Sequence, residues 1–153
     1  MIYLQNFITT TIQLNIYLIL VIGLLYVIIH YYRNKGVNAF LDIYLNYIPV
    51  LTHEFGHVLF NKLAGGKAKD LVIVTSPRER KVTSQQGYAI TQSKGYLGQF
   101  ITTIGGYLMP PLMFLTGLVS IHYQYPSIFI TIYLFIFIYY LFITSRKLSP
   151  LIV

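Results

Sequence analysis

The sequence predicts a mainly α-helical membrane protein with about four transmembrane helices and a short interfacial β-hairpin between the second and third helices. The first observation is composition: of 153 residues, 56% are hydrophobic and only 10% are charged, whereas a soluble domain carries about 25% charged residues. Too little charge is present to cover a water-facing surface, so most of the exterior must meet lipid. The second observation is that apolar runs of bilayer-spanning length alternate with short basic clusters. We expect residues 1–153 to form one domain.

The first two spans are predicted at residues 12–32 and 37–63. About twenty apolar residues cross a bilayer, and the first run carries no charge before it ends at Arg33. The second run ends at Gly65-Gly66, because glycine commonly terminates a helix. Pro49 lies inside this second run and is expected to kink it, since proline removes one backbone hydrogen bond.

Residues 67–94 interrupt the apolar pattern and are too polar to span a membrane. Short β-branched runs predict strands at residues 71–74 and 88–91. The charged stretch at residues 76–81 is interpreted as a solvated turn or loop between them. The segment is therefore expected to form the interfacial β-hairpin.

The last two spans are predicted at residues 96–120 and 126–144. The third is rich in glycine, which allows close helix packing, so we expect it to contact the second span. Pro110-Pro111 is expected to bend or break it. The fourth consists largely of Phe, Tyr and Ile, with no acidic residue and no histidine, and is interpreted as a lipid-facing or scaffold helix.

The distribution of lysine and arginine predicts the orientation. With both termini in the cytoplasm, residues 62–94 and the C-terminal segment bring nine of the eleven basic residues inside, and only Arg33 and Lys35 lie outside. We therefore expect a multi-pass protein of a bacterial cell membrane with cytoplasmic termini. The net charge of +7 is attributed to contact with anionic lipid headgroups, and no nucleic-acid partner is expected.

One stretch, Thr52-His53-Glu54-Phe55-Gly56-His57-Val58, contains the pattern H-E-x-x-H. Residues four apart on a helix share a face, so His53 and His57 can bind one Zn²⁺ at roughly 2.0–2.1 Å each. Glu54 is rotated by about 100° from His53, beside the metal, where it can act as general base toward a metal-activated water. These polar groups interrupt an apolar segment, where their burial is costly, which favours a metal site over a chance match.

Other metal ligands are scarce, because the chain has no cysteine and few further histidines or carboxylates. His30 is interpreted as an interfacial histidine in an aromatic belt. Asp42 precedes His53 by eleven residues, about 16 Å along a helix axis, and is too far away for the same metal. His122 falls on the far side of the membrane in the predicted topology.

Taken together, these residues resemble the site-2-protease group of intramembrane zinc metalloproteases, the M50 peptidases, and most closely their compact M50B-like branch. The resemblance covers about residues 45–120. Besides the H-E-x-x-H motif, the resemblance rests on glycines that follow the motif, on a β-rich segment and on a glycine-rich helix. The residues that match are Gly65-Gly66-Lys67, Gly87, Gly95-Tyr96-Leu97-Gly98 and Gly105-Gly106-Tyr107-Leu108.

The resemblance implies that His53 and His57 bind zinc, that Glu54 activates water, and that peptide bonds of membrane proteins or peptides are hydrolysed within or next to the bilayer. It also implies that residues 70–91 present the substrate as an extended strand. Site-2 proteases commonly take a third zinc ligand from an aspartate in a later helix, and Thr116 stands where that aspartate is expected. Gln99, Glu79 or a partner chain are the alternative sources of a third ligand.

Two functions follow as hypotheses. The first is a zinc-dependent intramembrane endopeptidase. The alternative is a non-catalytic M50-like membrane protein that acts as a binding or regulatory factor, and the missing third ligand motivates it. A transporter or channel component is disfavoured, because too few polar residues line the predicted spans. The substrate and the oligomeric state are not specified by the sequence.

Overall fold

The computed structural model describes residue 5 and residues 15–147. Within residues 15–147 the chain forms six helices and one two-stranded antiparallel sheet, in the order α2 (Ile16–Tyr31), α3 (Asn38–Leu45), α4 (Tyr47–Leu63), β1 (Lys67–Ile73), α5 (Pro77–Thr83), β2 (Gly87–Gln92), α6 (Gly95–His122) and α7 (Pro126–Ile143). The predicted class, mainly helical with a small sheet, is therefore confirmed.

Two described helices, α6 and α7, are long and apolar enough to cross a membrane, and α2 is a shorter apolar helix. The predicted number of four spans is not confirmed. The start of the first predicted span, residues 12–14, lies outside the described residues.

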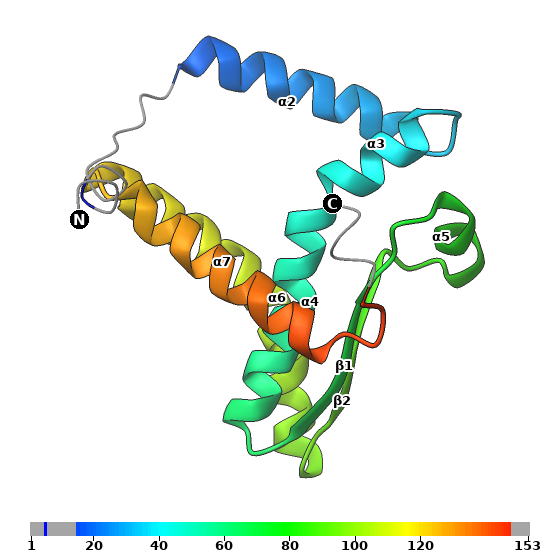
Figure 1. Ribbon diagram of the computed structural model, residues 1–153, viewed down its shortest axis with the longest axis vertical. Helices are drawn as coiled ribbons and strands as arrows, with labels where there is room; N and C mark the ends of the chain where they lie inside the picture. The colour runs from blue at the N-terminus through cyan, green and yellow to red at the C-terminus, as the bar shows by residue number, and fades with distance from the viewer. Residues whose placement is uncertain (1–4, 6–14, 148–153) are drawn as a thin grey trace.

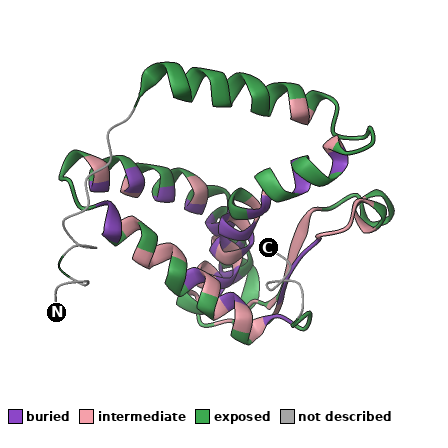
Figure 2. Ribbon diagram, turned by 45° about the horizontal axis from the view of Figure 1, so that its top comes forward, coloured by how far each residue is buried: buried purple, intermediate pink, exposed green. Residues whose placement is uncertain are grey.

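Helix α4 lies at the centre of the fold. Figure 1 shows α6 running along one side of α4 and the two strands along another, while α7 returns beside α6. Buried residues gather on α4, on β1 and on the parts of α6 and α7 that face them, whereas α2 is exposed along most of its length (Figure 2). An apolar helix exposed on nearly all sides suits a lipid environment. The core thus surrounds the helix that carries the H-E-x-x-H motif.

The second predicted span is two helices rather than one kinked helix. Helix α3 ends at Leu45, and α4 begins at Tyr47 after Asn46, whose backbone has φ −89° and ψ 0°. The cause is Pro49: its ring clashes with the carbonyl four residues earlier, that of Leu45, and it has no N–H to donate there. Within the first turn of α4 that missing N–H needs no partner, so the proline is tolerated. The break therefore lies three residues before the predicted kink.

The strands are longer than predicted, and the segment between them is not a simple turn. Strand β1 pairs antiparallel with β2, with Leu71 opposite Ala89 and Ile73 opposite Gly87. The charged stretch predicted as a turn or loop instead forms helix α5. Pro77 at its first position and Glu79 in its first turn favour a helix start, and basic residues occupy its last turn.

The C-terminal segment after α7 contacts the sheet. The Ser145 hydroxyl donates a hydrogen bond to the Asp70 carboxylate at 2.6 Å, and the Ser145 N–H donates another at 2.9 Å. These bonds fix the segment that follows α7 against β1.

Helix α6 continues through Pro110 and Pro111, so of the two predicted outcomes, a bend or a break, the break does not occur. Membrane helices tolerate proline where the freed carbonyls find other partners. Pro110 leaves the carbonyl of Gly106 without its helical donor, and the ring of His53 hydrogen-bonds the backbone at Gly106. A side chain of α4 thus lies against the turn of α6 that Pro110 interrupts.

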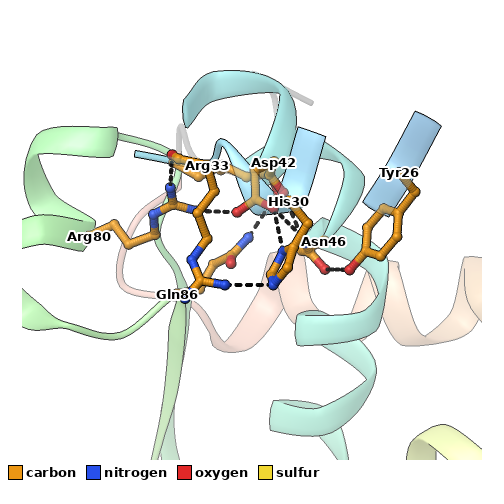
Figure 3. Close-up of polar contacts among 8 residues, drawn as sticks. Tyr26, His30, Arg33, Asp42, Asn46, Arg80 and Gln86 are labelled. Atoms are coloured by element: carbon orange, nitrogen blue, oxygen red, sulfur yellow. Dashed lines mark hydrogen bonds and ion pairs between the residues drawn. The ribbon is translucent and has the colours of Figure 1, made fainter. Parts of the chain in front are cut away.

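A polar network joins the α2–α3 connection to α5 (Figure 3). At its centre is Asp42, whose side chain is 1% exposed. Its carboxylate accepts hydrogen bonds from Arg80 at 2.5 Å and from Asn46 at 3.0 Å, and lies 2.8 Å from Nδ1 of His30. Arg80 also donates to the backbone oxygen of Arg33 at 2.9 Å. His30, interpreted from sequence as an aromatic-belt residue, is therefore the partner of a buried carboxylate.

This network brings α5 to the same part of the fold as Arg33. The prediction placed Arg33 and residues 62–94 on opposite faces of the bilayer, but Arg80 bonds directly to the Arg33 backbone. The basic residues of α5 therefore lie with Arg33 near the N-terminus of α4, whereas Lys62 lies near the C-terminus of that helix. The count of basic residues that favoured cytoplasmic termini assumed that all of residues 62–94 lie together, whereas the structure holds α5 beside Arg33 and apart from Lys62.

Replacing Arg80 by methionine is expected to destabilise the protein by about 2 kcal/mol. The change leaves the buried Asp42 carboxylate without its arginine, which costs about 3–5 kcal/mol for a buried pair, reduced here because His30 and Asn46 remain as partners. Unfolding of the detergent-solubilised protein by denaturant measures the loss. The matched control is Arg78→Met, an exposed arginine of the same helix, expected to change stability by less than about 0.5 kcal/mol. Equal effects from both variants would contradict a structural role for the Arg80 network.

Candidate metal centre

The two motif histidines point their Nε2 atoms at one another from successive turns of α4. These atoms are 3.2 Å apart. Two imidazoles bound to one tetrahedral zinc at 2.0–2.1 Å have ligand atoms about 3.3 Å apart. The donor set and its spacing therefore fit two ligands of a single zinc ion.

Both rings are oriented by the backbone of α6. Nδ1 of His57 donates to the carbonyl oxygen of Thr102 at 2.8 Å, and the His53 ring bonds the backbone at Gly106. The two α6 residues are one turn apart, as the two histidines are on α4. A proton on Nδ1 of His57 leaves its Nε2 lone pair free, which is the form that binds a metal.

Glycines allow α4 and α6 to approach closely enough for these bonds. A Cβ added to Gly56 would lie closer than 3.0 Å to the Gly105 carbonyl oxygen and to Met109. One added to Gly106 would collide with the His57 ring. The prediction that the glycine-rich helix packs against the motif helix is confirmed, and the contact is backbone to backbone.

Glu54 lies on the side of α4 that faces β2. It is 9% exposed, and its carboxylate accepts a hydrogen bond from the backbone of Ala89. Gly87 lets the strand approach, since a Cβ there would lie 3.1 Å from Cγ of Glu54 and closer to Val50. The general-base candidate is thus held between the motif helix and the strand.

An open cavity of about 740 Å³ connects these groups. Its lining comes from α4, from β2 with the residues just before and after it, and from the first turns of α6: His53, Glu54, His57, Gln85, Gly87, Tyr88, Ala89, Thr91, Ser93, Gly95, Tyr96, Gln99, Thr102 and Thr103. The three predicted site residues therefore share one cavity with one edge of a strand.

Within the part of the chain that the structure describes, no third ligand of the usual kind lies with the two histidines. Among the described residues no group of three His, Asp or Glu side chains could hold a metal. Glu79 is paired with Arg146 at 2.5 Å, and the hydroxyl of Thr116 donates to the Leu112 carbonyl. Gln99 alone of the predicted alternatives lines the cavity.

Besides Thr102, two further residues near the histidines were not predicted. The ring of Tyr107 lies 5.1 Å from that of His53, centroid to centroid. Asn61 is fully buried one turn after His57 and bonds to Thr102 and Ser93. A sequence signal for Asn61 exists, since a polar residue continues the His53–His57 spacing by four more positions.

Comparison with known proteins gives one match. A family model described as Peptidase M50B-like matches residues 16–153. No curated protein matches the chain, and no solved structure matches it.

Proposed function

The chain belongs to the M50B-like peptidase family, and from that premise we propose that it is a zinc-dependent endopeptidase that hydrolyses peptide bonds of membrane proteins or peptides within or next to the bilayer. The observation that carries the proposal is the 3.2 Å separation of the His53 and His57 Nε2 atoms, on the wall of the cavity that Glu54 also lines. The membrane setting agrees with the two helices long and apolar enough to span.

His53 and His57 would hold the metal through Nε2, with Nδ1 of His57 committed to Thr102. Zinc bound there supplies a Lewis acid, which polarises a peptide carbonyl and brings the ionisation of water close to neutral pH. Of the residues predicted as alternative third ligands, Gln99 is the one that lines the cavity. A partner chain is the other predicted source of a third ligand.

Glu54 is assigned the proton transfers. Its carboxylate takes a proton from the attacking water as oxygen adds to the peptide carbonyl carbon. It then gives that proton to the departing nitrogen as the C–N bond breaks, leaving a carboxyl group and an amine. The hydrogen bond from Ala89 and the close approach of Gly87 hold the carboxylate at the cavity wall while it does so.

The cavity-facing edge of β2 is assigned to the substrate. The Ala89 backbone bonds Glu54, so at this residue the strand directs hydrogen-bonding groups away from β1. Alternate residues of a strand direct their backbone groups to the same edge, which adds Gly87 and Thr91. An extended peptide added along that edge would run past Glu54 and the two histidines.

Removal of the metal tests the proposal. The purified wild type in lipid vesicles is expected to contain about one zinc per chain and to cleave a synthetic peptide with an apolar span, labelled at both ends. A chelator should abolish cleavage and added zinc should restore it, because the histidines hold the ion reversibly. His53→Ala and His57→Ala should each lose the zinc. Cleavage that persists in both variants would overturn the proposal.

The second candidate is a non-catalytic M50-like membrane protein that binds membrane segments as a regulatory factor. The absence of a third His, Asp or Glu ligand within the described residues favours it. Wild-type protein that binds the labelled peptide without zinc and without cleaving it would support this candidate over the peptidase.

A further inference from the structure

The carbonyl that orients His57 belongs to a residue whose side chain is itself held from three sides. Thr102 is buried on α6, and its backbone oxygen accepts the Nδ1 proton of His57 at 2.8 Å. Its hydroxyl donates to the carbonyl of Gly98 at 2.7 Å, one turn earlier on the same helix. The hydroxyl proton is therefore committed, and its oxygen is left as an acceptor.

Asn61 and Ser93 fill that acceptor capacity. Nδ2 of Asn61 donates to the Thr102 hydroxyl at 3.1 Å and to the Ser93 hydroxyl at 2.9 Å. The Ser93 hydroxyl lies 3.1 Å from that of Thr102, and it is the donor in this pair, because the Thr102 proton is already bonded to Gly98. Both Nδ2 protons, both lone pairs of the Thr102 hydroxyl and both hydroxyl protons are thus in use.

The network connects three elements next to the Thr102 carbonyl oxygen that His57 contacts. Asn61 comes from α4, Ser93 from the connection between β2 and α6, and Thr102 from α6. Asn61 is 0% exposed, so water cannot replace a hydrogen-bond partner that its Nδ2 group loses. A buried donor without a partner destabilises a protein by about 1–3 kcal/mol. The bonds from Asn61 and Ser93 therefore hold Thr102, and with it the carbonyl that His57 contacts, against α4.

We propose that Thr102, held by Asn61 and Ser93, is the positioning residue for His57. The triad of Asn61, Ser93 and Thr102 places a carbonyl where it keeps the His57 proton on Nδ1, and so presents Nε2 to the metal. The inference rests on the proposed function for its consequence, since a fixed tautomer raises zinc affinity only if His57 is a ligand. Groups that orient metal-binding histidines in this way typically change affinity by about 10–100-fold when removed.

The decisive variant is Thr102→Val, which removes the hydroxyl while keeping the backbone carbonyl and nearly the same shape. It is expected to weaken zinc binding by about 10-fold or more, measured in detergent by competition with a chromophoric chelator. Thr102→Ser restores the hydroxyl and should bind zinc within about threefold of wild type. Thr116→Val is the matched control: its hydroxyl makes the same kind of bond, to the Leu112 carbonyl at 2.8 Å on the same helix, and its loss should leave affinity unchanged.

A second readout needs no metal. In zinc-free protein with ¹⁵N-labelled histidine, nuclear magnetic resonance should report His57 as the Nδ1–H tautomer in wild type and Thr102→Ser, and as a mixture in Thr102→Val. If wild type binds no zinc but this tautomer pattern holds, the proposed function fails and the positioning role stands. If wild type binds zinc and Thr102→Val changes neither affinity nor tautomer, the positioning role is overturned and the peptidase proposal is unaffected.

Asn61 is tested through a double-mutant cycle, because its replacement alone also removes buried packing. Asn61→Ala should weaken zinc binding in the wild-type background and add little in the Thr102→Val background, since both changes break the same path to His57. Fully additive losses would show that Asn61 acts on the site by some other route and would remove it from the triad.

Discussion

Glu54→Gln is expected to lower the rate of peptide hydrolysis by about 10³-fold, within the range of 10²–10⁴ for loss of a general base, while zinc binding is retained. The amide has nearly the shape of the carboxylate and keeps an oxygen that can accept the bond from Ala89, so the cavity wall is preserved. It cannot take up the proton of the attacking water. Single-turnover cleavage of the labelled peptide at saturating zinc measures the loss.

The control for this experiment is Glu79→Gln, which removes another carboxylate at a distance from the cavity. Glu79 pairs with Arg146 and lies outside the cavity lining, so the hydrolysis rate should stay within about twofold of wild type, well below the general-base range. A Glu54→Gln protein that cleaves as fast as wild type would exclude Glu54 as the base, even with zinc bound.

The second large effect is expected from Gly105→Val, which should destabilise the protein by at least the upper end of the 1–3 kcal/mol range for overpacking and abolish zinc binding. A Cβ at this position would lie closer than 3.0 Å to Cβ of Phe60 and to the carbonyl oxygen of Gly56. A backbone oxygen cannot rotate away, so α4 and α6 must separate. Separation withdraws the Thr102 and Gly106 backbone groups that orient the histidines.

Gly23→Val provides the comparison. Gly23 lies in α2, and no atom lies within 4 Å of a Cβ added there, so the change should alter stability by less than about 1 kcal/mol through helix propensity alone. Denaturant unfolding and zinc content of both variants give the two measurements. Retention of zinc by Gly105→Val would contradict the dependence of the site on close helix packing.

Local sequence patterns predicted what depends on neighbours along the chain. The spacing of His53, Glu54 and His57 placed three groups on one helix, and the structure adds that they line one cavity. Glycine content predicted that α6 packs against α4. The limits of α7 follow from Pro126 at its start and the apolar run that comes after it.

What the sequence did not predict depends on residues far apart in the chain. The bond between His57 and Thr102 joins positions 45 residues apart, and that between Asn61 and Thr102 joins positions 41 apart. The periodic pattern of apolar residues along a sequence does not predict a contact between positions so far apart. The same limit applies to the predicted topology, because counting charges along the chain cannot detect that Arg80 meets Asp42 across 38 residues.

The contacts made by the segment after α7 also set an order of assembly. Strands β1 and β2 are close in sequence and can pair as soon as residue 92 has been synthesised, but Ser145 reaches Asp70 across 75 residues and Arg146 reaches Glu79 across 67. Contacts of such separation form late, because the loop they close must first be made and its entropy offset. Strand β1, which pairs with the strand beside Glu54, and helix α5 therefore acquire their final restraint only after α6 and α7 are in place. A nascent chain would therefore carry His53, His57 and Glu54 before the sheet beside them has acquired all its restraints.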